Sequence, residues 1–427
     1  MANSDLEKKL ASDQALPIYL LDDVSWDINF SSEMSNFGYQ IKKFRDVELF
    51  SEQLKKQHPA ILIININLVN NQLQNILIDI NEKSIDSKNI IIFISTSGEL
   101  SLRLKAVRLG GEGYFIKPFL TENLIARIDH LLKSAIDPNR ILIINNEIEA
   151  ASYYAAILEQ ANMKVCIITK SNEVDRALHE FNPDLILIDF IMPDCNGLEL
   201  AKIIRQQSIF QSISILFITS EEEKLKQLNK MRLGIDDFVT KSTQPIYFIM
   251  MIRNRIERYK KLRSLIVSDD LTGVYNHSFI QNQLEMKLKE SRRDHSPLSI
   301  ALIDLDQFKN INDSYGHQAG DQVLRCLGLM LGKWLHASDI AGRYSAEKFL
   351  VILPNTAPEA AKSVIDRLRK QFLMINYSWK EEMFNAFFSA GIASFPRFHT
   401  SAELISAAEK AMLRAKQLGR NRVELAT

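Results

Sequence analysis

The sequence predicts an α/β protein in which two tandem, doubly wound parallel sheets are followed by an α+β domain. Its 427 residues are too many for one domain with a single hydrophobic core, because one domain usually holds about 100 to 200 residues. Short β-branched runs alternate with amphipathic stretches over the first 260 residues, as buried parallel strands and their crossover helices do. The same landmarks then recur at a constant offset, which indicates a tandem duplication.

The expected strands of the duplicated part are six apolar runs. They are residues 18–21, 61–67, 90–95, 141–144, 185–190 and 215–220. Continuous apolar runs of this length are typical of strands buried on both faces. The chain is accordingly divided into a polar segment 1–16, domains 17–135 and 139–245, a helical linker 246–268 and a third domain 269–427.

Four pairs of residues carry the evidence for duplication. They are Asn65 and Asp189, Ser95 and Thr219, Tyr114 and Phe238, and Lys117 and Lys241. The members of each pair are 124 residues apart, for example 241 − 117 = 124. In such sheets the chemistry gathers at the carboxyl ends of the strands. Both copies place a hydroxyl and a lysine there, together with an acid or its amide.

The composition excludes several classes of protein. Lys and Arg number 52 and Asp and Glu also number 52, so no net charge recruits nucleic acid or an anionic membrane. Three scattered cysteines suit neither a disulfide framework nor a zinc site, and they fit a reducing cytosol. No apolar run approaches the roughly 18 residues of a membrane span. We therefore expect a cytoplasmic protein without membrane insertion.

The second copy contains three segments with a familiar order, LILIDFIMPDCNGLEL, FITS and DDFVTK. It resembles the receiver domain of bacterial response regulators, and the first copy resembles it through the duplication. The resemblance implies that a sensor histidine kinase phosphorylates an aspartate at the end of the third strand. It also implies a magnesium ion held by that aspartate and an acidic pair after the first strand, with the hydroxyl and the lysine binding the phosphoryl oxygens.

Neither copy retains the complete set. The first keeps Asp22, Asp23, Ser95 and Lys117, but Asn65 stands at the position of the nucleophile. The second keeps Asp189 as phosphoacceptor with Thr219 and Lys241, but Asn145 and Asn146 replace the acidic pair and only Glu147 is nearby. Losing carboxylates weakens a magnesium site, because this ion prefers anionic oxygen ligands. We expect both copies to serve as dimerisation and scaffold modules; phosphorylation of Asp189 is the alternative.

The linker is expected to be a helix with an apolar stripe. Ile249, Ile252, Ile256 and Tyr259 follow one another at spacings of three and four. This stripe suits a short two-stranded coil that joins two copies of the chain. It equally suits an amphipathic helix packed on its own domain, since two heptads do not specify a coiled coil.

In the third domain, Asp304 and Asp306 end an apolar strand and lie on the same strand face. They suit a metal and phosphate site, although two such acids alone are more commonly solvated. A longer pattern supports the site, namely DDLTGVYN, IDLDQFKNINDSYGHQAGD, RYSAEKFLVILP, FSAGIA and AMLRAKQLGRNRV. In order and spacing these segments resemble the GGDEF domain of diguanylate cyclases, which has a palm-like α+β fold. With two receivers before it, the whole chain resembles response regulators of the PleD type.

The resemblance implies that two GTP-loaded domains of a homodimer meet and form cyclic di-GMP. It assigns Mg²⁺ binding to Asp304, the carbonyl of Leu305 and Glu347. The implied GTP contacts are Asn312 and Asp321 at the guanine, Phe308 and Lys309 at the turn around the phosphates, Lys416 and Arg420 on one helix face, and Ala346 at the signature turn.

The signature itself departs from the family. Ser345, Ala346, Glu347, Lys348 and Phe349 occupy its five positions. Adjacent glycines usually mean positive φ or close approach of a ligand, and Lys348 reverses the charge of the acidic fourth position. At the implied inhibitory site, His336 replaces arginine ahead of Asp339. We therefore expect a GTP-binding signalling protein with little or no cyclase activity; an active diguanylate cyclase is the alternative.

Overall fold

The computed structural model describes most of the chain. The described residues are 16–23, 30–57, 59–83, 89–136, 138–192, 195–207, 210–219, 237–379 and 382–426. Nearly all of the expected polar segment 1–16 lies outside them. The chain forms two compact units, one made of residues 137–266 and the other of residues 1–136 together with 267–427.

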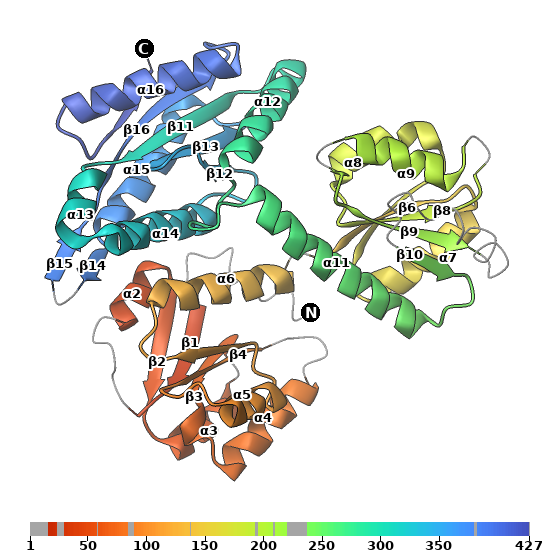
Figure 1. Ribbon diagram of the computed structural model, residues 1–427, viewed down its shortest axis with the longest axis horizontal. Helices are drawn as coiled ribbons and strands as arrows, with labels where there is room; N and C mark the ends of the chain where they lie inside the picture. Colours follow the sequence, from red (N-terminus) through yellow and green to blue (C-terminus); the bar gives the residue numbers. More distant parts are fainter. Residues whose placement is uncertain are drawn as a thin grey trace. The chain divides into compact units, whose positions relative to one another are not determined.

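The first domain is a five-stranded parallel sheet with helices on both faces (Figure 1). Its strands, in the order β2-β1-β3-β4-β5, are β1 (Leu16–Leu21), β2 (Tyr39–Phe44), β3 (Ile61–Asn65), β4 (Ile90–Ser95) and β5 (Gly113–Ile116). One face is covered by α2 (Phe30–Asn36) and α6 (Thr121–Ile136). The other is covered by α3 (Val47–Lys56), α4 (Asn71–Lys83) and α5 (Leu100–Arg108).

The second domain repeats this architecture. Its strands, in the order β10-β9-β8-β6-β7, are β6 (Arg140–Ile144), β7 (Lys164–Ile168), β8 (Leu185–Asp189), β9 (Ser214–Thr219) and β10 (Asp237–Thr240). Helices α8 (Val174–Phe181) and α9 (Gly197–Gln206) cover one face, and α7 (Ile148–Gln160) and α11 (Pro245–Val267) cover the other. Because the strand orders match element for element, the structure confirms the fold class inferred from the duplication.

The linker belongs largely to the second domain. Residues 245–267 form the single helix α11, which begins earlier than the expected linker. Ile252, Ile256 and Tyr259 are buried in the cores of the second domain, and Ile249 packs against them. The apolar stripe is therefore covered by its own domain, which favours the amphipathic-helix interpretation over a two-stranded coil.

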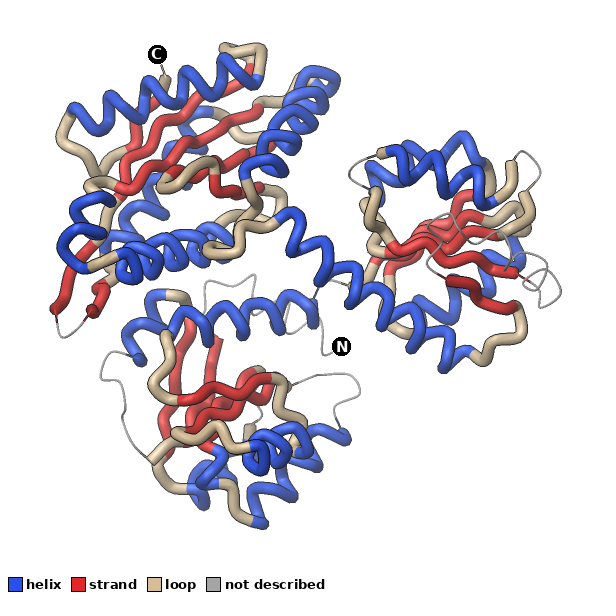
Figure 2. The backbone as a smooth tube through the Cα atoms, in the orientation of Figure 1, coloured by secondary structure: helices blue, strands red, loops and turns tan. Residues whose placement is uncertain are grey.

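The C-terminal domain has a mixed five-stranded sheet. Its strands, in the order β12-β13-β11-β16-β17, are β11 (Leu298–Leu305), β12 (Ile340–Arg343), β13 (Lys348–Pro354), β16 (Phe388–Phe395) and β17 (Val423–Leu425). A separate hairpin pairs β14 (Asn376–Trp379) with β15 (Glu382–Asn385). The helices are α12 (His277–Asp294), α13 (Phe308–Tyr315), α14 (His317–Trp334), α15 (Pro358–Leu373) and α16 (Ser401–Gln417). Figure 2 shows the helices as layers outside the sheet.

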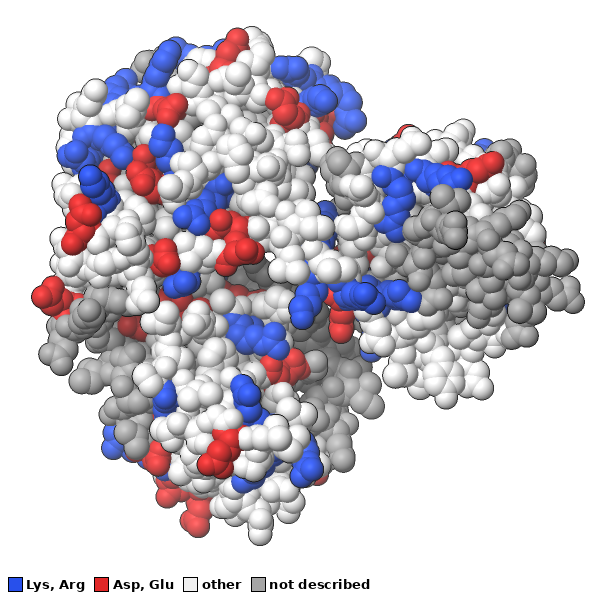
Figure 3. Space-filling view, in the orientation of Figure 1, with Lys and Arg blue, Asp and Glu red and all other residues white. Residues whose placement is uncertain are grey.

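The surface and the helices agree with the balanced composition. On the face shown in Figure 3, basic and acidic side chains of the described residues are interspersed rather than gathered by sign. Among the helices that the structure describes, none contains a stretch long and apolar enough to cross a membrane.

Candidate functional site

Two of the predicted metal ligands, Asp304 and Leu305, lie at the end of β11, the central strand of the C-terminal sheet. Strand β11 pairs with β13 so that Asp304 lies opposite Lys348, and the amide of Leu305 donates to the carbonyl of Glu347 at 3.4 Å. Asp304 is buried, whereas Glu347 is partly exposed. The backbone of Asp304 and Leu305 at the end of β11 therefore lies beside that of Glu347 and Lys348. That these residues bind a metal ion stays a prediction.

The ammonium of Lys416 neutralises Asp304. Its Nζ lies 2.7 Å from Asp304 Oδ1, and the carboxylate is only 5% exposed. A buried carboxylate needs such a partner, because an unpaired charge is costly in the interior. Lys416 thus reaches from α16 to the carboxylate that the resemblance assigns to the metal, in addition to its implied role at the phosphates.

Lys348 has a partner of its own. Its Nζ donates to Glu409 Oε1 on α16 at 2.7 Å. The hydrogen bond to Glu409 is the main cause of a raised pKa for Lys348, so this side chain stays charged. Lys348 reverses the charge of the fourth signature position, and the structure pairs it with Glu409. Its positive charge is therefore already balanced beside the site.

An arginine side chain binds the backbone of the signature turn that contains Ser345 and Ala346. Arg343 donates from Nη2 to the carbonyl of Ala346 at 2.7 Å and from Nη1 to the Asp269 carboxylate at 3.1 Å. Burial alone raises the pKa of Asp269, but hydrogen bonds from Thr272 and the charge of Arg343 lower it overall. Asp269 and Arg343 lie within the segments that carry the resemblance, yet no pattern in the sequence indicates that they pair.

The turn contains no strained residue. Ser345 and Ala346 are exposed, and neither is among the residues with positive φ. The amides of Tyr344 and Ser345 both donate to the carbonyl of Lys348, so Ser345 and Ala346 form this turn without a positive φ. The remaining reason for glycine is close approach of a ligand.

The predicted guanine-binding residues lie on either side of a helix junction. Asn312 is in α13 and Asp321 in α14, and Gly316 joins the two helices with φ +87°. The side-chain oxygen of Asn312 is buried and has no hydrogen-bond partner among the residues that the structure describes. A Cβ at Gly320 would lie 2.0 Å from that oxygen, so a larger residue at this position would have to displace the Asn312 side chain. Asn312 thus presents an unsatisfied acceptor of the kind that a guanine N–H group satisfies.

Phe308 and Lys309 differ in exposure. Phe308 is 9% exposed and packs in the domain core, whereas Lys309 is exposed. The aromatic ring therefore supports the turn that follows β11, and only the lysine is free to reach an anionic ligand.

Arg420 does not share a helix face with Lys416. Helix α16 ends at Gln417, and Gly419 follows with φ +113°, a left-handed conformation that ends the helix. The prediction that both cations lie on one helix face is therefore wrong. Arg420 is exposed in the loop beyond the helix.

A buried carboxylate anchors that loop. Asp306 accepts hydrogen bonds from the Ser389 hydroxyl at 2.8 Å and from the Asn421 amide at 3.0 Å. Burial raises the pKa of Asp306, while these two bonds oppose the rise. The sequence placed Asp306 beside Asp304 as a second site acid; its contacts instead assign it to positioning the loop that carries Arg420.

The positions of the implied inhibitory site form a closed turn. The amide of His336 donates to Asp339 Oδ2 at 2.9 Å, and the His336 ring contacts the Ser338 hydroxyl at 2.9 Å. Burial raises the pKa of Asp339. Histidine lacks the planar fork of arginine, so we expect that cyclic di-GMP does not bind at this site, and no observation tests this expectation.

In the first domain the predicted residues form a self-satisfied cluster. Lys117 Nζ donates to both oxygens of Asp22 at 2.6 and 2.7 Å. Asn65 Nδ2 donates to Asp22 at 2.9 Å and to Asp23 at 3.1 Å, which a carboxylate at this position would not do. The fully buried Ser95 accepts from the amide of Ser97 at 3.1 Å.

In the second domain, the residues around the predicted phosphoacceptor Asp189 differ in burial. Asp189 and Thr219 are buried, whereas Lys241 is exposed. Asn145 is fully buried and accepts from the Glu147 amide at 2.8 Å, and its own amide nitrogen has no partner among the described residues. Burial raises the pKa of Asp189; Lys241 opposes and Glu147 adds to the rise.

Replacing Asp189 with asparagine is expected to stabilise the second domain at pH 7 by about 1 kcal/mol, a usual size for one substitution. A carboxyl group whose folded pKa is raised contributes stability that is present below the unfolded pKa and is lost as the pH rises through the folded pKa. The gain should therefore shrink as the pH falls toward 4. Amide hydrogen exchange in β8 of the full chain measures it.

The control is Asp175→Asn, which changes an exposed carboxylate in the same domain. It should alter exchange little at either pH. An Asp189→Asn variant whose β8 exchanges faster at pH 7 than in the natural chain would contradict the argument.

Two family models match the chain. The model described as "Diguanylate cyclase, GGDEF domain" matches residues 266–422, and that described as "Response regulator receiver domain" matches residues 141–253. The first domain is not among these matches, so its receiver character rests on the duplication and on the equal strand order.

Several curated proteins are similar to the chain. Response regulator PleD of Caulobacter vibrioides is 28% identical over 298 residues, which cover 66% of this chain and 65% of PleD. Diguanylate cyclase A of Treponema denticola is 27% identical over 78% of this chain and 97% of that protein. Diguanylate cyclase DgcP of Pseudomonas aeruginosa is 36% identical over 38% of this chain and 24% of that protein. The chain thus spans slightly less than two thirds of the length of PleD.

Among solved structures, the GGDEF domain of DgcB from Caulobacter crescentus in complex with c-di-GMP is 27% identical to the chain. The alignment covers 38% of this chain and 93% of that one, with a TM-score of 0.37.

Proposed function

We propose that the chain is a response regulator, as its matches to the receiver-domain and GGDEF-domain models indicate, and that it binds GTP with little or no cyclase activity. The observation that carries the binding is the buried, unsatisfied oxygen of Asn312, held against Gly320 at the junction that also carries Asp321. A polar atom left unpaired in the interior is costly, and a ligand donor removes that cost.

The residues present also fit a magnesium ion. Asp304, Glu347 and the carbonyl of Leu305 are hard oxygen donors, and Mg²⁺ is commonly bound by one or two carboxylates plus substrate phosphates. The ion would offset the charge of the triphosphate when bound. Lys309 is exposed near the end of β11 and supplies a cation for the same anionic group.

The low activity follows from the signature turn. Ala346 adds a methyl group to the exposed face of the turn, where the resemblance implies that nucleotide lies. The fourth signature position holds Lys348, which forms an ion pair with Glu409. No carboxylate is therefore available at this position. Loss of one preorganised electrostatic group commonly costs about a hundredfold to a thousandfold in rate.

The second candidate is an active diguanylate cyclase that joins two GTP molecules in a homodimer. Two observations favour it: the turn needs no positive φ, and the charge of Lys348 is balanced by Glu409. In both candidates the receiver copies are proposed to act as scaffold or dimerisation modules. Phosphorylation of Asp189 by a sensor histidine kinase is the alternative to that role.

GTP is expected to bind at least about tenfold more tightly than ATP, since guanine-specific hydrogen bonds to a buried amide and a carboxylate contribute about 1.5 to 3 kcal/mol. Asn312→Ala and Asp321→Ala should each remove most of that preference. Calorimetric titration of the full chain with each nucleotide and magnesium measures it.

The matched control is Asn310→Ala, which removes an exposed amide from the same helix as Asn312. It should leave both affinities unchanged. Equal affinity for GTP and ATP in the natural chain would refute the guanine assignment.

A further inference from the structure

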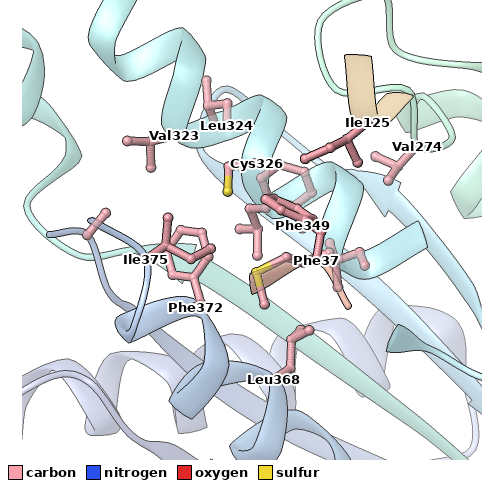
Figure 4. Packing of buried hydrophobic residues seen from close by; sticks show 14 of the residues in the cluster. Phe37, Ile125, Val274, Val323, Leu324, Cys326, Phe349, Leu368, Phe372 and Ile375 are labelled. Atoms are coloured by element: carbon pink, nitrogen blue, oxygen red, sulfur yellow. The ribbon is translucent and has the colours of Figure 1, made fainter. Parts of the chain in front are cut away.

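The first domain and the C-terminal domain share one buried core within their common unit. Helix α6 of the first domain contacts α14 of the C-terminal domain. Figure 4 shows Phe37 and Ile125 of the first domain in the same cluster as Cys326 of α14. These three side chains are 3%, 0% and 1% exposed, so the contact shields them from bulk solvent.

Polar contacts fix the position of α14 toward both of its ends. Near its start, Gln322 Nε2 donates to Glu122 Oε1 at 2.9 Å, and both side chains are buried. Near its end, Lys333 Nζ lies 3.5 Å from Asp129 Oδ1 and 3.3 Å from the centre of the Tyr39 ring. The Tyr39 hydroxyl in turn donates to Asp129. A buried hydrogen bond to a carboxylate and a cation over an aromatic ring both depend on position, so the docked arrangement is specific.

The contact reaches the proposed nucleotide site through adjacent residues. Gly320, Asp321 and Gln322 are consecutive in the sequence. Gly320 packs against the side-chain oxygen of Asn312. Glu122 therefore holds the same turn of α14 that presents Asp321. Sliding or rotating α14 away from α6 would also move Gly320 relative to Asn312.

We propose that the first domain is a clamp on the C-terminal domain: docking of α6 on α14 holds the nucleotide-binding turn in place, so that docking and GTP binding strengthen each other. This inference rests on the proposed GTP site. Because coupling between two sites is reciprocal, GTP must then also tighten the docked state. The first domain would regulate the C-terminal domain in this way without being phosphorylated, which suits the amide at Asn65.

Cys326 provides a reporter of docking. In a Cys166→Ser, Cys195→Ser background it is the only one of the three cysteines left, and it is 1% exposed under α6. Gln322→Glu would set a second carboxylate against Glu122 and open the contact. Cys326 should then react with a thiol reagent at least about tenfold faster, as buried groups do when a local opening becomes more frequent.

A charge exchange separates this effect from simple damage. Adding Glu122→Gln to Gln322→Glu recreates an amide and carboxylate pair with the two roles reversed, and should return Cys326 to slow reaction. Lys55→Glu, which changes the charge of an exposed residue on α3 of the first domain, is the matched control and should have no effect. Lys333→Glu, which opposes Asp129, is a second route to opening if a protonated carboxyl keeps the first variant closed.

GTP binding tests the coupling itself. Gln322→Glu should weaken GTP binding by roughly 5- to 150-fold, the usual range of coupling between sites, and the exchanged pair should restore it. In the parent chain with Cys326 as its only cysteine, GTP should slow the reaction of Cys326. Unchanged GTP affinity in a variant with reactive Cys326 would overturn the coupling, and slow Cys326 in both opening variants would overturn a clamp that opens. If the natural chain binds no GTP, the proposed function and the coupling fail together, while Cys326 still decides whether the docked contact exists.

Discussion

Ala346→Gly combined with Lys348→Glu is expected to raise cyclic di-GMP synthesis by about a hundredfold or more over the natural chain, because it restores a close approach to the turn and one preorganised electrostatic group. The ends of β11 and β13 already bring Asp304 and Glu347 together. The variant changes only the turn in front of them. Chromatographic detection of product from GTP and magnesium measures the gain.

The structure adds a requirement to this experiment. A carboxylate at position 348 would face Glu409, which now accepts from Lys348 at 2.7 Å. The variant should therefore also be made with Glu409→Gln, so that repulsion from α16 does not mask the gain. Adding Asp304→Asn is the negative control and should abolish product. A natural chain that makes product as fast as the variant would establish the active cyclase and reject the proposed loss of chemistry.

The sequence predicted the central strands well, because strands buried on both faces appear as unbroken apolar runs. All five residues of β3 and all five of β8 are buried. The edge strands gave no such signal. In β2, for example, Lys42 and Lys43 are exposed, since one side of an edge strand faces solvent.

The site was predicted as a set of residues but not as a set of contacts. Asp304, Asn312 and Asp321 followed from motif spacing, which is local in sequence. Lys348 and its partner Glu409 are 61 residues apart in the sequence, and Asp269 and its partner Arg343 are 74 residues apart. Such pairs depend on how α16 and β12 pack in the folded domain. A single sequence contains no pattern that predicts contacts between residues so far apart along the chain.

Lys117→Met is expected to destabilise the unit that contains the first domain by about 3 to 5 kcal/mol, the usual cost of removing one partner of a buried ion pair. The side chains of Lys117 and Asp22 are only 6% and 5% exposed, and their charged atoms are 2.6 Å apart. Without the ammonium, Asp22 keeps only the amide of Asn65 as a side-chain partner among the contacts described here. Chemical unfolding followed by tryptophan fluorescence measures the loss, because Trp334 and Trp379 lie in the same unit.

The double variant Lys117→Met, Asp22→Asn distinguishes a charge effect from a packing effect. If the cost arises from an uncompensated carboxylate, neutralising Asp22 should recover most of it, since removing both members of a buried pair costs far less than removing one. Lys55→Met, on the exposed face of α3, controls for loss of a surface cation and should change stability by less than about 0.5 kcal/mol. A Lys117→Met variant as stable as the natural chain would mean that the ion pair contributes no net stability. Asp22 could then exchange Lys117 for another partner without loss of stability. The predicted loss instead makes the lysine a structural member of the domain, which explains why it persists beside an asparagine that no longer accepts a phosphoryl group.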